Sequence, residues 1–206
     1  MFVDVHTHNS DISKGFSILN LSIKDAELKL NSNEKGTYSV GLHPWDIDEF
    51  SNEHLDIIAK IGTDRRILAI GECGLDNNIK IPIEKQIRFF EKQIEISEQL
   101  QKPLIIHCVG CYNQLFEIKK SKKVNQKWII HGFRGKPELA IQAMKLNFGL
   151  SFGEFFNEET IKITAIENLF VETDVSNLTI GEIYENIATI KKCNPTDLTA
   201  GKLLFF

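Results

Sequence analysis

Six side chains that can ligate a metal ion follow short apolar runs at widely separated places in the sequence. They are four histidines and two carboxylates: His6, His8, Glu72, His107, His131 and Asp174. Neutral imidazole suits borderline-soft divalent ions, and a carboxylate can bridge and neutralise a second ion nearby. Six ligands are enough for two ions, and two such ions would activate a water molecule for hydrolysis.

The first two histidines have a spacing that suits a strand. His6 and His8 stand at positions i and i+2 after the apolar run FVDV, so both imidazoles are expected to point to one face. An exposed loop would also accommodate an HxH sequence. The core strand that leads into the pair favours metal binding.

Each carboxylate also has a structural alternative. Glu72 follows ILAIG, where an unpaired charge would be expensive, and a salt-bridged strand end is the alternative to a ligand. We expect Gly71 and Gly74 to give a ligand room there. Asp174 in VETD could be a helix N-cap, but the next helix is predicted to begin only near Thr179.

Two further histidines repeat one pattern. His107 and His131 each end an Ile-Ile-His run on consecutive predicted strands. A single histidine after a strand is usually only a hydrogen-bonded residue. Two histidines in the same position, separated by one predicted helix, indicate a shared site.

These residues lie on an alternating series of strands and helices. The predicted strands are short apolar runs, expected to be buried on both faces, at 2–7, 17–22, 38–43, 67–72, 103–108, 127–132, 147–152 and 169–174. The predicted helices are 51–61, 82–101, 111–122, 136–146 and 179–192. This alternation predicts a compact (β/α)8 TIM barrel, in which all strand ends reach one rim.

The barrel must be tight at its start. Residues 9–16 cannot hold a helix between the first two strands, so that helix is expected to be missing or shortened. An extended segment of this length still spans about 26 Å. Residues 23–36 are expected to form at most one or two helical turns. No linker divides the chain, so we expect one domain over residues 1–206.

Composition excludes several classes of protein. A net charge of −4 and a pI near 5.9 argue against broad, nonspecific binding to nucleic acid. No apolar run approaches the ~18 residues of a membrane span, and the N-terminus lacks signal-peptide features. We therefore expect a cytoplasmic protein without a membrane partner, and a monomer by default. Cys108 and Cys111 form a lone CxxC, for which buried thiols are favoured over metal or redox use.

Six motifs in order resemble those of one enzyme family. DVHTH, GLHPW, GECGLD, IIH, HGF and ETD look like the TatD-related deoxyribonucleases, which are metal-dependent (β/α)8 hydrolases of phosphodiester bonds. The resemblance covers nearly the whole chain, including the closing AGKLLFF. Each motif alone is weak, whereas six in order at sensible spacing are specific.

The resemblance implies two divalent ions, and the ligand types leave Zn, Mn, Co or Mg open. It implies that His6, His8 and Asp174 hold one ion, that His107 and His131 hold the other, and that Glu72 bridges them. Mixed histidine and carboxylate ligation makes Mg²⁺ the less natural choice. His43 would lie beside the site, and Asp76 would support the ligands.

The chain also departs from the family pattern. The family usually has a phosphate-binding arginine two residues after the fifth-strand histidine, where this chain has Val109, and Gly110 replaces the next acidic residue. Arg134, in HGFRGK, could supply the positive charge from the adjacent loop. Arg134 and Lys136 are thus the basic residues expected to bind substrate.

The expected activity is hydrolysis of a phosphodiester, most naturally in DNA. Glu72 or Asp174 would take or orient the proton of the attacking water, and His43 would contact the phosphate or protonate the leaving oxygen. A metal-dependent hydrolase of a small ester, amide or lactone is the alternative that Val109 favours. A noncatalytic metal-binding module is the remaining alternative.

Overall fold

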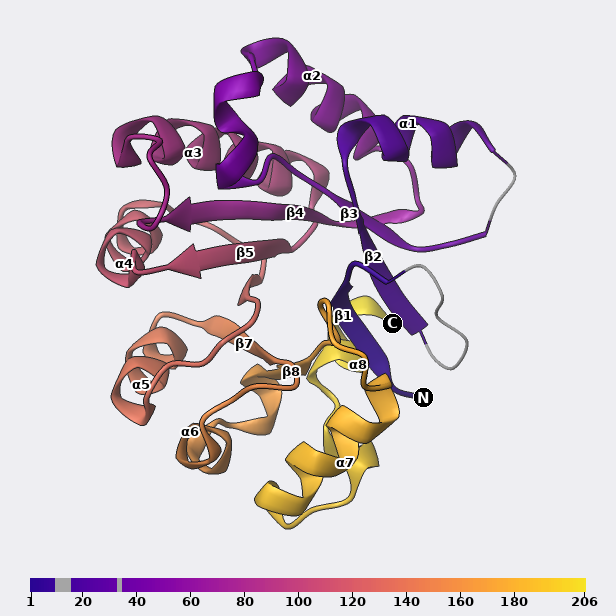
Figure 1. The fold of residues 1–206 in the computed structure, drawn as a ribbon, viewed down its shortest axis with the longest axis vertical. Helices are drawn as coiled ribbons and strands as arrows, with labels where there is room; N and C mark the ends of the chain where they lie inside the picture. The colour runs from indigo at the N-terminus through magenta and orange to yellow at the C-terminus, as the bar shows by residue number, and fades with distance from the viewer. Residues whose placement is uncertain (10–15, 33–34) are drawn as a thin grey trace. The chain divides into compact units, whose positions relative to one another are not determined.

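The computed structural model describes residues 1–9, 16–32 and 35–206, in which strands and helices alternate along the chain (Figure 1). The strands are β1 Val3–Thr7, β2 Phe16–Leu21, β3 Tyr38–Val40, β4 Ile67–Asp76, β5 Leu104–Val109, β6 Trp128–Ile130, β7 Phe148–Phe152 and β8 Leu169–Val171. The α-helices are α1 Ile23–Asn31, α2 Asn52–Ile61, α3 Ile83–Leu100, α4 Tyr112–Ser121, α5 Pro137–Lys145, α6 Glu158–Ile163, α7 Ile180–Lys191 and α8 Ala200–Phe205. Short 3-10 helices are η1 Pro44–Glu49, η2 Ile166–Asn168 and η3 Pro195–Asp197.

The strands form one sheet whose order follows the chain from β1 to β8. Pairing is parallel where β1 meets β2, β3 meets β4, β4 meets β5 and β7 meets β8. A parallel bridge between Thr7 and Asp174 also joins the end of β1 to the segment after β8. The predicted (β/α)8 fold class is therefore confirmed.

All eight predicted strands are present, and β4 differs most from its predicted bounds. It continues to Asp76, so Glu72 lies within the strand and not at its end. The extension pairs with β5, in a register that places Gly74 opposite His107 and Asp76 opposite Val109. The end of β4 was not predicted because its sequence, ECGLD, contains two charged residues and a glycine, which are uncommon in strands.

The five predicted helices correspond to α2, α3, α4, α5 and α7. The helix α1 covers nine residues, which is longer than expected, and Ser22 caps it by accepting a hydrogen bond from the backbone N–H of Asp25. The six-residue helices α6 and α8 were not predicted, because two turns are too short to establish a helical period. The prediction of a missing helix between the first two strands falls on residues 10–15, outside the described residues.

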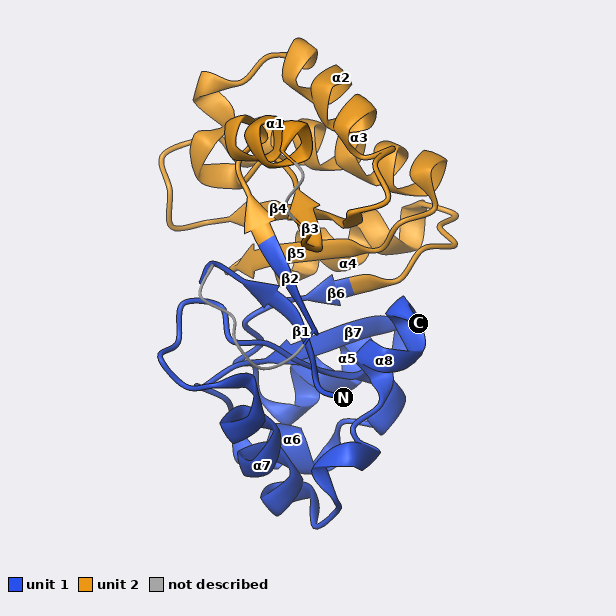
Figure 2. Cartoon of the chain, turned by 90° about the vertical axis from the view of Figure 1, so that its right-hand side faces the viewer, with its two compact units in different colours: residues 1–19, 129–206 blue, residues 20–128 orange. Residues whose placement is uncertain are grey.

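The chain forms two compact units, residues 1–19 with 129–206 and residues 20–128 (Figure 2). Each has its own apolar core. In residues 20–128 the rings of Phe90 and Trp128 pack edge to face, with centroids 5.6 Å apart. In the other unit Phe133 and Phe152 do the same at 5.9 Å.

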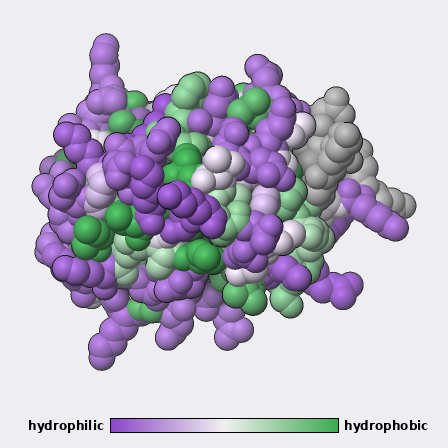
Figure 3. Space-filling model, turned by 90° about the horizontal axis from the view of Figure 1, so that it is seen from below, coloured by the Kyte–Doolittle hydropathy of each residue, from purple (hydrophilic) through white to green (hydrophobic). Residues whose placement is uncertain are grey.

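The surface face drawn in Figure 3 is mainly hydrophilic, with apolar side chains in small separate patches. Scattered apolar groups of this kind are normal on a protein surface. Within the described part of the chain, no helix has both the length and the apolar character that crossing a bilayer requires.

Candidate metal centre

His107, within β5, is held between two carboxylates in the unit formed by residues 20–128. Its Nε2 lies 3.1 Å from Asp76 Oδ2, and its Nδ1 lies 3.0 Å from Glu72 Oε1. A metal-ligating histidine typically donates one ring N–H to a carboxylate and turns the other nitrogen to the ion. Asp76 has the position of that orienting carboxylate, which leaves Nδ1 facing the same space as Glu72.

Asp76 is buried and strongly hydrogen-bonded. The indole Nε1–H of Trp45 donates to Oδ2 at 2.8 Å, and the backbone N–H of Asn78 donates to Oδ1 at 2.8 Å. Burial alone would raise the pKa of Asp76, but these hydrogen bonds and His107 outweigh it and lower the pKa. Asp76 is therefore an ionised acceptor at neutral pH. The sequence motif GLHPW gave no indication that Trp45 would contact it.

His43 has a defined tautomer because it begins a helix. It is the N-cap of η1, where its Nδ1 accepts a hydrogen bond from the backbone N–H of Trp45 at 3.2 Å. The proton of a neutral ring must then reside on Nε2. That nitrogen lies 3.2 Å from Glu72 Oε1, so His43 is a donor directed at Glu72.

The glycines beside Glu72 serve a purpose other than the expected one. Gly71 and Gly74 have φ of +143° and +142°, and a Cβ on either would collide with the β5 backbone at Ile105 or His107. They permit β4 to approach β5 closely, and so bring Glu72 and His107 together. That they also make room for a ligand stays a prediction.

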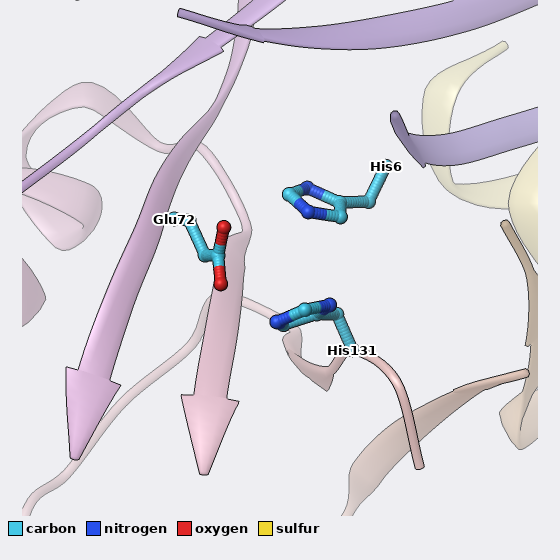
Figure 4. Close-up of side chains that lie close together, drawn as sticks. All are labelled: His6, Glu72 and His131. Carbon is cyan, nitrogen blue, oxygen red and sulfur yellow. The ribbon is translucent and has the colours of Figure 1, made fainter. Parts of the chain in front are cut away.

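His6, His8 and Asp174 come together in the unit formed by residues 1–19 and 129–206. Asp174 Oδ1 lies 3.8 Å from His6 Nε2 and 3.9 Å from His8 Nε2. Figure 4 shows the rings of His6 and His131 next to each other, and the carboxylate of Glu72 projecting from β4. The ring centroids of His6 and His131 are 4.4 Å apart. His6 is fully buried, whereas the side chain of His8 is 40% exposed.

Asp174 is held in place by its backbone. Its N–H donates to the carbonyl of His6, and its carbonyl accepts from the N–H of His8, both at 3.0 Å. Its φ of +51° lies in the left-handed region, which aspartate tolerates better than most residues. Asp174 therefore continues the strand ladder and is not the N-cap of a helix; Thr179 is that cap.

Sequence reasoning missed Glu172, two residues before Asp174. This carboxylate is fully buried. Its Oε1 lies 3.5 Å from His131 Nδ1 and accepts a hydrogen bond from the backbone N–H of Gly132 at 2.6 Å. Burial favours its neutral form, but hydrogen bonding and charge from His131 outweigh burial and lower the pKa of Glu172. Its position directly after the apolar run LFV was the available signal.

Asp4 was also missed, and it joins β1 to the segment after β8. Its Oδ1 accepts from the backbone N–H of Thr173 at 3.0 Å, and its Oδ2 accepts from the Thr173 hydroxyl at 2.6 Å. Burial, opposed by these hydrogen bonds, raises the pKa of Asp4 to about 7. Asp4 fixes the strand that carries His6.

A pocket of about 120 Å³ lies beside Asp174 and Glu172. Arg134 lines it, so one of the two basic residues expected to bind substrate is placed at a cavity. Lys136 is the N-cap residue of α5 and does not line this pocket in the described structure. Val109 closes β5, where the family resemblance leads one to expect an arginine two residues after His107.

The CxxC pair has the character of buried thiols. Cys108 and Cys111 are both free and buried. Burial raises the pKa of Cys108 to about 12, and it also raises the pKa of Cys111. Redox and metal chemistry both require thiolates, which these environments disfavour.

Three groups of side chains, each inside one unit, place possible ligand atoms within 4.8 Å of one another. They are His43 with Glu72 and His107, His6 with His8 and Asp174, and His131 with Glu172 and Asp174. Imidazole with carboxylate is a donor set for Zn²⁺, Mn²⁺ or Co²⁺.

Comparisons with known proteins agree with this donor chemistry. The family model described as TatD related DNase matches residues 4–197. The uncharacterized metal-dependent hydrolase YabD of Bacillus subtilis is 33% identical over 68% of this chain and 59% of its own length, less than two thirds of that relative. A 3'-5' ssDNA/RNA exonuclease TatD of a Pantoea species is 28% identical over 66% of this chain and 56% of its own.

A solved structure shows the same fold. The crystal structure of YjjV, a TatD homologue from Escherichia coli K12, superposes with a TM-score of 0.83 at 17% identity, covering 98% of this chain and 95% of that one. At 17% identity the structural similarity shows a shared fold, and the match to the family model shows membership of the family. The chain belongs to the TatD related DNase family.

Proposed function

We propose that the protein is a metal-dependent hydrolase that cleaves phosphodiester bonds in DNA, with two divalent ions held by His6, His8, Glu72, His107, His131 and Asp174. The observation that carries the proposal is the arrangement of His107, with one nitrogen on Asp76 and the other beside Glu72. A histidine with only a structural role does not require two carboxylates. The curated relatives named as metal-dependent hydrolase and exonuclease support the same activity.

The donor sets fit divalent ions. His107 Nδ1 and Glu72 Oε1 are 3.0 Å apart, so both can be ligands of one ion. Glu172 is a fully buried carboxylate that requires a positive partner, and His131 lies beside it. Bound ions would supply an activated water at neutral pH and neutralise charge that develops on the phosphoryl oxygens.

The side chains of this chain have separate tasks. The partial exposure of Asp174 and its position in the pocket wall support it as the acceptor of the proton of the attacking water, with Glu72 as the second candidate. His43 carries the proton of its neutral ring on Nε2, which suits it to donate a hydrogen bond to a phosphoryl oxygen; to protonate the leaving oxygen it would first have to gain a proton on Nδ1 in place of the hydrogen bond from Trp45. Arg134 provides a guanidinium for the phosphate, in place of the absent arginine at Val109. Lys136 would add charge from the start of α5.

A carboxylic ester, amide or lactone is the competing substrate class. Val109 favours it, because a neutral substrate needs no guanidinium at that position. Arg134 at the pocket favours a phosphodiester. A noncatalytic metal-binding module is the third possibility.

A substrate panel distinguishes these functions. Protein freed of metal and supplied with Mn²⁺, Zn²⁺, Co²⁺ or Mg²⁺ is expected to cleave a single-stranded oligodeoxynucleotide and to leave carboxylic esters, amides and lactones intact. Hydrolysis of an ester, amide or lactone alone would replace the proposal with its competitor. Metal uptake without turnover of any substrate would favour the noncatalytic module.

We also propose that residues 1–206 act as one hydrolase domain. The family model spans 4–197, which crosses both compact units. The free cysteine thiols support a reducing, cytoplasmic location.

A further inference from the structure

The pocket beside Asp174 has an aromatic rim. Phe155 and Val175 line it together with Arg134, and they are 60% and 74% exposed. A large aromatic ring left in water at the edge of a cavity is the kind of surface that ligands cover. None of the proposed metal-binding or proton-transfer roles uses Phe155.

Arg134 lies against this ring. Its guanidinium carbon is 5.2 Å from the ring centroid of Phe155, within the range of a cation–π contact. The contact holds the flat guanidinium near the pocket while its N–H groups stay available to an anion. The guanidinium therefore lies over one face of the ring, and the ring is still 60% exposed, so its other face can accept a second planar group.

The backbone keeps the pocket open. Gly132, with φ of +56°, and Gly153 both line it. Among the described residues, a methyl group on Gly132 would have only Glu172 Oε1 within 4 Å, at 3.8 Å, so it would occupy pocket space. The absence of side chains at these positions leaves a path between the aromatic rim and the carboxylates.

The chemistry of this rim matches one nucleotide of a single strand. A nucleobase is flat and uncharged, so it can stack on Phe155 without repulsion from Glu154, Glu172 and Asp174, and its phosphate can meet Arg134. Stacking tolerates any base, since every base has a π-face. A base inside a duplex has both faces covered by its neighbours, so only an unpaired base can stack there.

We infer that Phe155 is a stacking platform for an unpaired nucleobase of the substrate, and that Arg134 binds the phosphate of the same nucleotide. This inference rests on the proposed nuclease function. Under this inference, Phe155 is the side chain that makes the protein prefer single-stranded to double-stranded substrate.

Binding and stacking can be measured without turnover. Metal-loaded protein would be titrated with a phosphorothioate oligodeoxynucleotide that carries 2-aminopurine, whose fluorescence falls when the base stacks. Phe155→Ala is expected to weaken binding about tenfold to hundredfold and to abolish the quenching. Phe155→Trp should retain both. Phe206→Ala, which removes another exposed phenylalanine, should match the wild type.

An abasic residue provides a sharper control. The abasic residue is moved along the strand from one position to the next. At one position it should weaken binding to the wild type by about the same factor as Phe155→Ala does. In the Phe155→Ala protein it should cause no further loss of affinity. Additive losses, or unchanged quenching in Phe155→Ala, would overturn the inference.

The two proposals fail in different ways. Cleavage of an unmodified oligodeoxynucleotide by the wild type, with binding and quenching unaffected by Phe155→Ala, would refute the stacking platform alone. A wild-type protein that neither cleaves nor binds the strand would refute both.

Discussion

Neighbouring groups determine which nitrogen of His107, His131 and His43 is available at the candidate centre. Asp76 occupies Nε2 of His107 and directs Nδ1 toward Glu72. Glu172 lies on the Nδ1 side of His131, and the helix cap at Trp45 fixes the tautomer of His43. Orienting partners of this kind commonly change metal affinity as much as an altered ligand does.

Asp76→Asn tests this arrangement directly. The substitution keeps the shape of the side chain and removes its charge, so the affinity for the divalent ion is expected to fall about 10- to 100-fold. Competition with a chromophoric chelator would measure the affinity. Asp48→Asn, which removes an exposed carboxylate paired with Lys85, is the control that should leave it unchanged. Equal affinities in the two variants would contradict the orienting role.

The sequence predicted most of the histidines and carboxylates that come together in the three groups, and few of their hydrogen-bond partners. A histidine or carboxylate after an apolar run is visible in the primary structure, as at His107 and His131. The contact between Trp45 and Asp76 depends on tertiary packing across 31 positions, and no local pattern encodes it. Glu172 was overlooked because Asp174 in the same motif already explained the charge.

At the scale of elements, the pairing of β4 with β5 controls the position of Glu72. Gly74 must remain glycine, since its φ is +142° and a Cβ would meet the carbonyl of His107. Short or charged segments were the poorly predicted ones. The helices α6 and α8 give too few turns for a period, and the end of β4 reads as polar although its register with β5 makes it a strand.

Gly74→Ala should destabilise the protein by roughly 2 kcal/mol or more, because it combines backbone strain with a steric clash. Urea unfolding would measure the loss. Gly181→Ala in α7 is the matched control, since the nearest atom to its Cβ, in the part of the chain that the structure describes, is a ring carbon of Phe2 at 3.8 Å. Alanine in a helix should be neutral or stabilising there, by up to about 1 kcal/mol. A similar effect at both glycines would refute the packing argument.

We expect Lys119, on α4, to make the free energy of unfolding depend on pH. Its Nζ lies 4.2 Å from the ring centroid of Trp128. Burial and the charge of Lys127, opposed by Glu98, lower the pKa of Lys119 from 10.5 to about 8. The unfolded chain then binds more protons between these pH values, so the contribution of Lys119 to stability should rise from pH 8 to 10.5.

Comparison of variants isolates this contribution. The free energy of unfolding in urea would be measured at pH 7.5 and at pH 10. The contribution from Lys119 should raise it between these pH values in the wild type, and this rise should be absent in Lys119→Met. Lys120→Met, at an exposed lysine paired with Glu117, should keep it. A Lys119→Met protein with the wild-type pH dependence would show that Lys119 is not the group responsible.

At the scale of the whole molecule, the order of the motifs corresponds to the order of the strands. The sheet runs from β1 to β8, and the residues proposed as ligands lie on β1, β4, β5, β6 and β8 or within three residues after one of them. Short buried strands alternating with amphipathic helices made this fold class predictable. The division into two compact units was not predicted, because strands β2 and β6 continue from one into the other without a linker (Figure 2).

Ion binding should stabilise the whole chain. An ion at about one hundred times its dissociation constant adds roughly 2.7 kcal/mol, which corresponds to a rise in Tm of about 5 to 10 °C for a chain of this size. Differential scanning fluorimetry with and without a chelator would measure it. Glu72→Gln should lose most of the rise, and Glu84→Gln on α3 should keep it. A rise that persists in Glu72→Gln would place the ion elsewhere.

The central claim is that hydrolysis of phosphodiesters depends on ions held by these histidines and carboxylates. The most direct measurement is the rate of cleavage of a single-stranded oligodeoxynucleotide as Mn²⁺, Zn²⁺, Co²⁺ or Mg²⁺ is added to chelated protein. We predict no cleavage before addition, and a rate that reaches its plateau at about two ions per chain for at least one metal. Full cleavage by the metal-free protein, or none with any of these ions, would contradict the account.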